Sequence, residues 1–96
     1  MPWYVYVLEN EKGRRYVGST GRTPQLRLAE HNAGLNHWTR AHGPWRLIYW
    51  ETYDDKCLAL ARERFLKTGA GRRVRDRLIA SVQTQRAHGS ARIESA

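Results

Sequence analysis

The stretch WYVYVLEN, residues 3–10, constrains the fold of this 96-residue chain more than any other feature. Both of its alternating sets of positions are apolar or aromatic, so neither side of the segment is suited to contact with water. We therefore predict a strand that is buried on both faces. The turn sequence ENEKG and a second extended run, RRYVGS, follow directly, which predicts a β-hairpin over residues 3–19.

A helix, a loop and a third strand are predicted next. Thr23 supplies a hydroxyl N-cap and is followed by Pro24, a residue favoured at the first helical position. Gly34 is suited to end this helix, because glycine readily takes the left-handed conformation. LNHWTRAHGP is predicted to be a polar, basic loop, and WRLIYWETY to be the third strand.

Two more helices are predicted in the C-terminal part. The acidic pair at 54–55 caps the first, which runs to about Thr68, where GAG interrupts it. Its apolar stripe is predicted to contain Cys57, Leu58, Ala61 and Phe65. The second helix is indicated by the spacing of Val74, Leu78 and Val82.

The resulting order is ββαβαα, which predicts an α/β fold in which helices pack on a single sheet. The chain is long enough for one modest core, and we expect a single domain over residues 1–82. From residue 83 the composition becomes polar and small, so 83–96 is predicted to be a flexible C-terminal tail. No apolar run approaches the roughly 20 residues that span a bilayer, and we expect no membrane partner.

The charge balance favours a nucleic-acid partner. Seventeen Lys and Arg against nine Asp and Glu give a net charge of +8. The basic residues concentrate between 62 and 77, a pattern typical of a phosphate-binding surface; the alternative is a solvated, solubilising face. We expect phosphate contacts from four arginines: Arg40, Arg72, Arg73 and Arg75. Cys57 is the only cysteine, which excludes an internal disulfide and a thiolate zinc site and favours a reducing, cytoplasmic location.

Two polar residues share one flank of the first helix. Arg27 and His31 are four residues apart, hence one turn apart, whereas Leu26, Ala29 and Ala33 are predicted to mark the inward side. The less demanding interpretation is an Arg27–Glu30 ion pair with His31 solvated.

Glu63 lies between Leu60 and Leu66 on the next-to-last helix. A carboxylate among leucines is unfavourable unless it is satisfied, and a divalent metal would satisfy it. A surface pair with Lys67 is the alternative. In the hairpin, Tyr6 and Tyr16 lie on paired strands, so their phenols can approach each other across the ladder.

The motif order resembles the GIY-YIG nuclease superfamily, to which the amino-terminal domain of a DNA-repair excinuclease belongs. YVY at 4–6 and YVG at 16–18 are similar to the two halves of its signature. LRLAEHNAG, TRAHGPWRLIYWE and ALARERFLKTGAGR are similar to the rest of a small standalone domain of this kind. The resemblance covers residues 2 to about 80. It implies a three-stranded antiparallel sheet flanked by helices, and phosphodiester hydrolysis assisted by one divalent metal ion.

Carried over by position, the resemblance assigns catalytic roles to Tyr6, Tyr16, Arg27, His31 and Glu63, with Glu63 as the metal ligand. It leaves open which tyrosine orients or deprotonates the water. Two positions depart from the pattern. Tyr4 stands where the first motif has glycine, and Ser19 stands where some relatives have lysine.

The function predicted from the sequence is that of a metal-dependent endonuclease. We expect Mg²⁺ or Mn²⁺ as the cofactor, DNA in preference to RNA as the substrate, and a role on branched or damaged DNA in repair or recombination. The alternatives are a nucleic-acid-binding module that does not cleave, and an interaction domain whose charge serves only solubility. The active form is expected to be a monomer or weak dimer.

Overall fold

A computed structural model describes the backbone of residues 2–87 and the side chains of residues 2–83. Its sheet has three strands, β1 (Trp3–Asn10), β2 (Arg15–Thr20) and β3 (Trp45–Tyr53), in the order β2-β1-β3. Both pairings are antiparallel, and β1 is the central strand. The four helices are α1 (Pro24–Asn32), α2 (His37–Arg40), α3 (Lys56–Leu66) and α4 (Gly69–Ala87). The predicted α/β fold with an antiparallel three-stranded sheet is confirmed.

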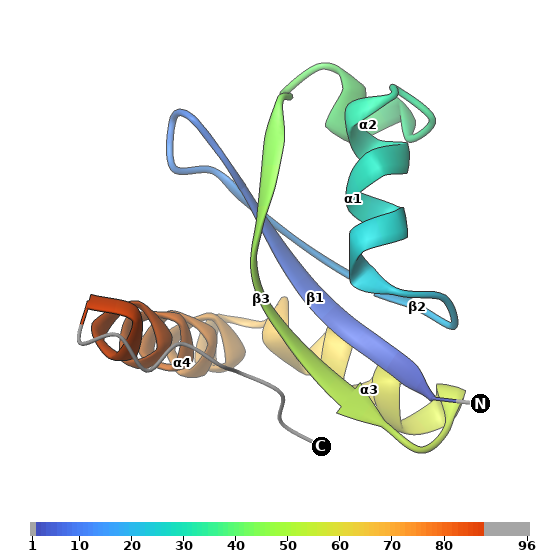
Figure 1. Cartoon of the computed structure of the whole chain (residues 1–96). Helices are drawn as coiled ribbons and strands as arrows, with labels where there is room; N and C mark the ends of the chain where they lie inside the picture. The colour runs from blue at the N-terminus through green and yellow to red at the C-terminus, as the bar shows by residue number, and fades with distance from the viewer. Residues whose placement is uncertain (1, 88–96) are drawn as a thin grey trace.

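Helices cover the sheet on both sides (Figure 1). On one side, Val5, Val7 and Val17 of the hairpin pack against residues of α3 and α4, among them Leu66 and Ile79. The other side holds a second cluster of apolar and aromatic residues beneath α1: Tyr6, Leu8, Trp45 and Leu28. The prediction that β1 is buried on both faces is therefore correct.

Local signals at the turns and helix starts behave as the sequence predicts. Gly13 takes a positive φ of 80° in the hairpin turn, and Gly34 takes 82° just after α1. The Thr23 hydroxyl accepts a hydrogen bond from the Leu26 amide at 3.2 Å, which caps α1. The Asp55 carboxylate caps α3 in the same manner, through the Leu58 amide at 2.9 Å.

The buried Glu51 carboxylate fixes α3 against β3. Arg62 of α3 donates to both of its oxygens, at 2.9 and 3.0 Å. The hydroxyls of Tyr49 and Tyr53 also donate to it, each at 2.5 Å. Since Glu63 follows Arg62 directly, this network sets the position of the turn of α3 that carries Glu63.

The structure corrects the predicted inward faces of two helices. On α1, Leu26, Ala29 and Ala33 are not buried, whereas His31 is. His31 faces inward because Tyr6 and Thr39 supply hydrogen-bond partners for its ring inside the fold. On α3, none of the predicted stripe of Cys57, Leu58, Ala61 and Phe65 is buried, and the buried residues are Ala59 and Leu66.

Two segment boundaries also differ from the prediction. The expected loop after α1 contains the one-turn helix α2, which begins because the Asn36 side chain accepts hydrogen bonds from the amides of Trp38 and Thr39. The helix α4 continues to Ala87, so the predicted boundary at residue 82 falls within a helix. Residues 88–96 of the expected tail lie outside the described residues.

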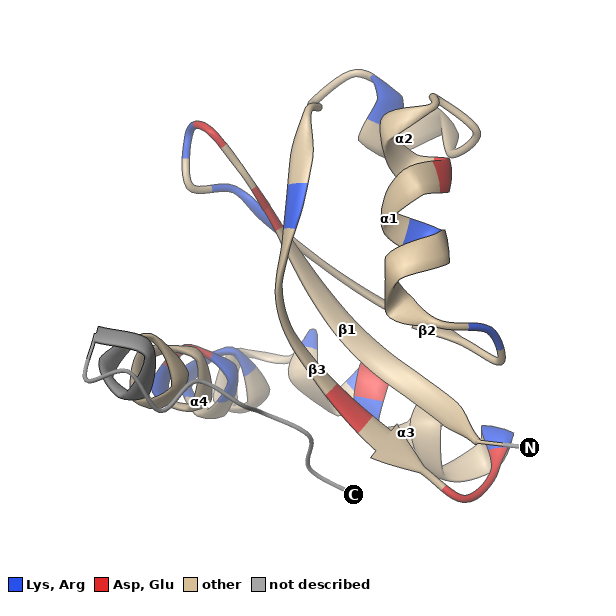
Figure 2. Cartoon of the chain, viewed as in Figure 1, with Lys and Arg blue, Asp and Glu red and all other residues tan. Residues whose placement is uncertain are grey.

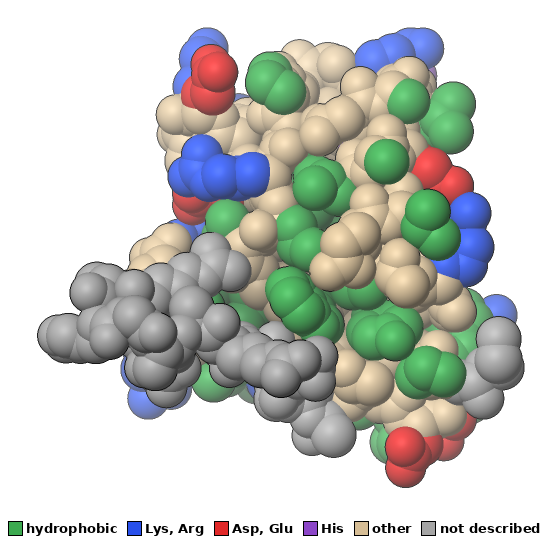
Figure 3. Space-filling view, viewed as in Figure 1, with side chains coloured by type: hydrophobic (Ala, Val, Ile, Leu, Met, Phe, Trp, Pro, Cys, Tyr) green, Lys and Arg blue, Asp and Glu red, His purple; other side chains and the backbone are tan. Residues whose placement is uncertain are grey.

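Hydrophobic side chains gather across the middle of the face shown in Figure 3, with charged side chains around them. Among the described helices, none is long and apolar enough to cross a bilayer.

Candidate active site

Tyr6 is fully buried at the centre of the sheet, and its position depends on a glycine. Gly18 is its partner across the β1–β2 ladder. A Cβ atom at Gly18 would lie 2.5 Å from the Tyr6 hydroxyl oxygen and 2.6 Å from the ring carbon that carries it. Gly18 thus marks a close approach between the backbone of β2 and the Tyr6 ring, a frequent reason for glycine inside a strand.

A hydrogen-bonded chain runs from Tyr6 through His31 to Thr39. The Tyr6 hydroxyl lies 2.9 Å from Nε2 of His31, and Nδ1 of the same ring lies 2.7 Å from the Thr39 hydroxyl. Burial lowers the pKa of His31, and the nearby Arg27 charge lowers it further, so the imidazole is neutral at pH 7. A neutral imidazole donates to one of these hydroxyls and accepts from the other.

Arg27 lies at the Tyr6 end of this hydrogen-bonded chain, next to the Tyr6 hydroxyl. Burial raises the pKa of Tyr6 to about 12, against the opposing effect of the Arg27 guanidinium next to its hydroxyl. Arg27 also pairs with Glu30 at 2.6 Å, as the less demanding interpretation predicted, but the solvated His31 of that interpretation is wrong, because His31 is buried. The ion pair and the contact with Tyr6 are therefore compatible, because Arg27 has several donors in a fixed planar fork.

Tyr16 is the partly exposed member of the cluster. Its ring lies 5.0 Å from that of His31 and stacks on Trp38 at 5.8 Å, measured between centroids. It lines an open hollow of about 230 Å³ between β2, α2 and α4, whose other lining residues are Arg15, Val17, Trp38, Lys67, Arg72 and Arg75. A phenol in this position contacts solvent, whereas the Tyr6 phenol does not.

Glu63 lies toward the opposite face of the sheet and is connected to the same hollow through Lys67, which lines it. Ser19 points to the α3 side of β2, and its hydroxyl donates to Oε1 of Glu63 at 2.5 Å. Lys67 donates to Oε2 at 2.8 Å, and its Nζ lies 5.8 Å from the Tyr16 ring centroid. Because β2 is an edge strand, groups from both faces meet around it.

The expected basic residues divide into two sets. Arg72 and Arg75 line the hollow beside Tyr16. Arg73 and Arg40 do not line it, and Arg40 instead contacts His37 at 3.2 Å. Figure 2 shows basic positions recurring along α4, so that this helix presents positive charge to more than one side.

The geometry matches what sequence comparison finds. The profile of the GIY-YIG catalytic domain matches residues 2–75. This chain belongs to the GIY-YIG family. A UPF0213 protein of Natronomonas pharaonis is 37% identical over 78 residues, which is 80% of this chain and 89% of that protein. One from Halobacterium salinarum is 42% identical over 65 residues, covering 67% and 83% respectively.

A solved structure has the same fold. The solution NMR structure of a UPF0213 protein from Bacillus halodurans aligns with a TM-score of 0.51 and 32% identity. The match covers 83% of this chain and 84% of that one. The GIY-YIG domain described here is therefore similar to UPF0213 proteins in both sequence and fold.

Within this GIY-YIG domain, the donor set suits only a metal with few protein ligands. No group of three or more His, Cys, Asp and Glu side chains among the described residues could hold an ion. Glu63 offers one partly exposed carboxylate, paired with Lys67, which lines the open hollow. Mg²⁺ is commonly held by one or two carboxylates together with water and substrate phosphate oxygens, and Glu63 fits that arrangement.

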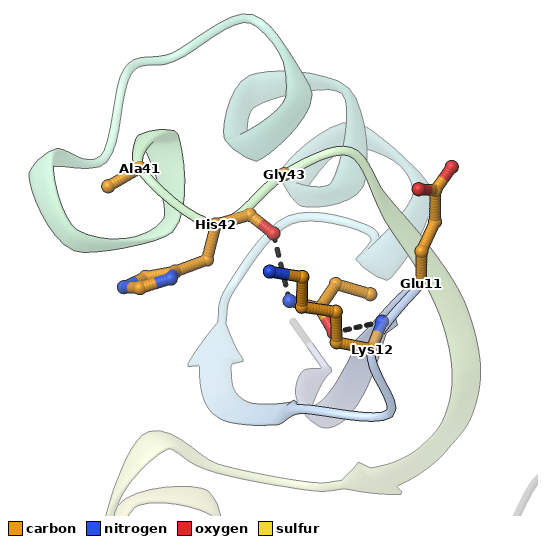
Figure 4. A pocket seen from close by; sticks show the side chains of 6 residues that line it. Glu11, Lys12, Ala41, His42 and Gly43 are labelled. Atoms are coloured by element: carbon orange, nitrogen blue, oxygen red, sulfur yellow. Dashed lines mark hydrogen bonds between the residues drawn. The ribbon is translucent and has the colours of Figure 1, made fainter.

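A second hollow, of about 150 Å³, lies between the hairpin turn and the segment after α2 (Figure 4). Asn10 organises it. Its side chain donates to the His42 carbonyl at 3.0 Å and accepts from the amides of Lys12 and Arg14. These hydrogen bonds fix the turn against His42, whose amide donates to the Thr39 carbonyl at 3.1 Å and whose ring lies 4.6 Å from that of Trp38.

Sequence reasoning missed three contributors to the site. Thr39 lies in the segment predicted to be a loop, although a hydroxyl eight residues after His31 is a possible partner for it. Lys67 is predicted only as a surface partner of Glu63. Ser19 departs from the family pattern, and its hydrogen bond to Glu63 depends on the packing of β2 against α3, which no sequence spacing reveals.

Proposed function

We propose that this GIY-YIG domain is a divalent-metal-dependent endonuclease that hydrolyses phosphodiester bonds of DNA. One observation carries the proposal. Buried Tyr6 and His31 form a polar cluster with partly exposed Arg27, and this cluster contacts Tyr16 at the wall of the basic hollow. Glu63 is joined to the same wall by its ion pair with Lys67. A hydrophobic core does not need these polar side chains, whereas phosphodiester hydrolysis has a role for each of them.

Tyr16 is assigned to orient the attacking water, because it is the phenol that contacts solvent. Tyr6 is hydrogen-bonded to His31 and Arg27 and is assigned to hold these two side chains in position. Arg27 receives a non-bridging phosphate oxygen, since a guanidinium fork matches phosphate geometry. Water adds to phosphorus and the bridging P–O bond breaks. The proton of the water leaves through the Tyr16 hydroxyl to solvent, and the leaving oxygen takes a proton from bulk water.

Glu63 is assigned to hold one Mg²⁺ or Mn²⁺, oriented by the hydrogen bond from Ser19. When bound, such an ion neutralises charge that develops on the phosphate in the transition state. Arg15, Arg72 and Arg75 bind flanking phosphates of the strand. These contacts do not read sequence, so we expect cleavage with weak sequence preference, on branched or damaged DNA in repair or recombination.

The test is cleavage of supercoiled plasmid and of a panel of branched, nicked, flapped and single-stranded DNA with Mn²⁺. Wild type is compared with Glu63→Gln, which keeps the shape of the side chain and removes its charge. We expect nicking by the wild type only, with DNA binding retained by the variant. Equal cleavage by both proteins would contradict the assignment of Glu63.

A binding module that does not cleave is the second candidate. It is favoured by the Glu63–Lys67 ion pair, which occupies the carboxylate proposed as the metal ligand. Tight DNA binding by the wild type with no metal-dependent cleavage of any substrate in the panel would support this alternative. The same assay with RNA oligonucleotides distinguishes the two nucleic acids.

A further inference from the structure

Both oxygens of the Glu63 carboxylate already have a partner. Oε1 accepts from Ser19 at 2.5 Å, and Oε2 accepts from the Lys67 ammonium at 2.8 Å. The two partners differ in kind. Ser19 is neutral and fixed in a strand, whereas Lys67 carries a charge at the end of a flexible stem and its side chain is 48% exposed. A divalent cation at Glu63 would repel Lys67 and leave Ser19 unaffected.

The hollow beside Tyr16 offers a second position for the Lys67 ammonium. It lines the hollow together with Tyr16, Arg15 and Arg72, and its Nζ already lies 5.8 Å from the centre of the Tyr16 ring. The side chain rotates about several bonds, and its ammonium has three donors. A small rotation therefore carries the charge from the Glu63 carboxylate toward a phosphate in the hollow.

We propose that Lys67 is an internal counter-ion of the metal site. It pairs with Glu63 in the metal-free protein, is displaced when a divalent cation binds, and then contacts a phosphate of the substrate. This rests on the proposed function, because it takes Glu63 as the metal ligand. Ser19 keeps the carboxylate oriented during the exchange, so the ligand is not lost to solvent when Lys67 leaves.

The exchange is physically feasible because the ion pair is weak. A partly exposed Lys–Glu pair contributes little to stability, so a doubly charged ion can replace it. The exchange also couples two ligands. Metal binding frees Lys67 for phosphate, and by linkage phosphate binding favours the metal-loaded state. The competing interpretation is an ordinary i,i+4 surface pair, which predicts no special effect of Lys67 on metal affinity.

The first test measures Mn²⁺ affinity without nucleic acid, from the EPR signal of free Mn²⁺. Lys67→Met removes the charge and keeps much of the stem. Lys56→Met is the matched control, since it removes the same charge from the other end of α3, where Lys56 lies over the Trp3 ring. We expect Lys67→Met to bind Mn²⁺ about two- to fivefold more tightly than Lys56→Met, the range that corresponds to releasing one surface ion pair.

Three outcomes separate this proposal from the proposed function. Weaker binding by Glu63→Gln with unchanged affinity in Lys67→Met would overturn only the role of Lys67. Equal Mn²⁺ binding by wild type and Glu63→Gln would overturn the metal site and, with it, this proposal. Tighter binding by Lys67→Met that disappears in the double variant with Glu63→Gln would support both.

The second test addresses the phosphate contact. A DNA oligonucleotide is titrated at saturating Ca²⁺, a cation chosen so that binding is measured apart from cleavage. Loss of one phosphate contact is expected to weaken binding by Lys67→Met about three- to fivefold relative to Lys56→Met. Equal affinities of the two variants would show that the released lysine does not reach the substrate.

Discussion

The hydroxyl oxygen of Tyr6 lies 2.9 Å from Nε2 of His31, and both side chains are almost completely buried. A phenol and an imidazole that are removed from water need each other as partners, because an unpaired buried polar group is costly. Gly18 makes this arrangement possible by leaving the space beneath the Tyr6 ring empty. The geometry of the proposed catalytic cluster therefore depends on a residue with no side chain.

Gly18→Ala should damage activity without unfolding the protein. The added methyl would lie 2.5 Å from the Tyr6 hydroxyl, so the ring must shift away from His31. A displacement of this kind costs roughly 10²-fold in rate when the group supports a reacting centre. DNA nicking measures it. Gly69→Ala is the control, because a Cβ there meets nothing within 4 Å; equal rates in the two variants would contradict the prediction.

The two tyrosines should respond differently to loss of the hydroxyl. Tyr16→Phe keeps the stack on Trp38 but removes the hydroxyl assigned to the attacking water, and cleavage should fall about 10²-fold or more with stability unchanged. Tyr6→Phe leaves a nitrogen of buried His31 unpaired, which should lower the free energy of unfolding by about 1–3 kcal/mol. Cleavage rates and urea denaturation separate the two effects. Wild-type cleavage by Tyr16→Phe would reverse the assignment of the water to this residue.

The strands and helix caps could be predicted from the sequence, because their signals are local. The apolar pattern of residues 3–10 and the pair Thr23–Pro24 each determine a feature within a few neighbours. The inward face of α1 could not be predicted. His31 is buried because Tyr6 and Thr39 satisfy both ring nitrogens, and these partners come from outside α1. A rule that turns apolar residues inward therefore selects the wrong face.

Glu51 should make the stability of the domain sensitive to acid. Burial alone would raise the pKa of Glu51, but hydrogen bonds from Arg62, Tyr49 and Tyr53 outweigh it and lower the pKa below the ordinary 4.5. The stabilisation is thus fully present above pH 4.5 and is lost as the pH falls through the folded-state pKa. Glu51→Gln should be less stable than wild type at pH 7, by about 3–5 kcal/mol if Arg62 is left unpaired.

Thermal unfolding of both proteins from pH 7 down to pH 2 measures this difference. The gap in melting temperature between wild type and Glu51→Gln should narrow as the pH falls from 4.5 through the lowered pKa of folded Glu51, because the unfolded wild-type chain binds the proton more readily than the folded one. A gap that stays constant across the range would show that the charge of Glu51 contributes nothing. Glu11→Gln serves as the control, since Glu11 is exposed in the hairpin turn.

The tight join between α3 and α4 should tolerate no side chain at Gly71. A Cβ at this position would lie 1.7 Å from the Phe65 carbonyl oxygen, a backbone atom that cannot rotate away. Gly71→Ala should therefore destabilise the domain by about 1–3 kcal/mol or more, as expected for overpacking. Gly69→Ala, two residues earlier in open space, should be neutral or slightly stabilising because alanine favours a helix. Urea denaturation of both variants checks the contrast.

The arginines of α4 should contribute unequally to DNA binding. Arg72 and Arg75 line the hollow beside Tyr16, whereas Arg73 and Arg77 are exposed on the helix away from it. Each phosphate contact releases condensed counterions, so the slope of log K against log salt counts the contacts. Replacing Arg72 and Arg75 with alanine should reduce the magnitude of this slope by about 1.5–2 units.

The double variant of Arg73 and Arg77 is the matched control for net charge, since it also removes two arginines from α4. Its slope should stay close to that of the wild type, because charges outside the strand's path displace few counterions from it. Fluorescence anisotropy of a labelled oligonucleotide over a series of salt concentrations gives both slopes. Equal reductions of the slope in the two variants would mean that the arginines of α4 attract DNA only through their total charge and make no specific phosphate contacts. A loss confined to Arg72 and Arg75 would instead place the strand across the hollow, within reach of Tyr16.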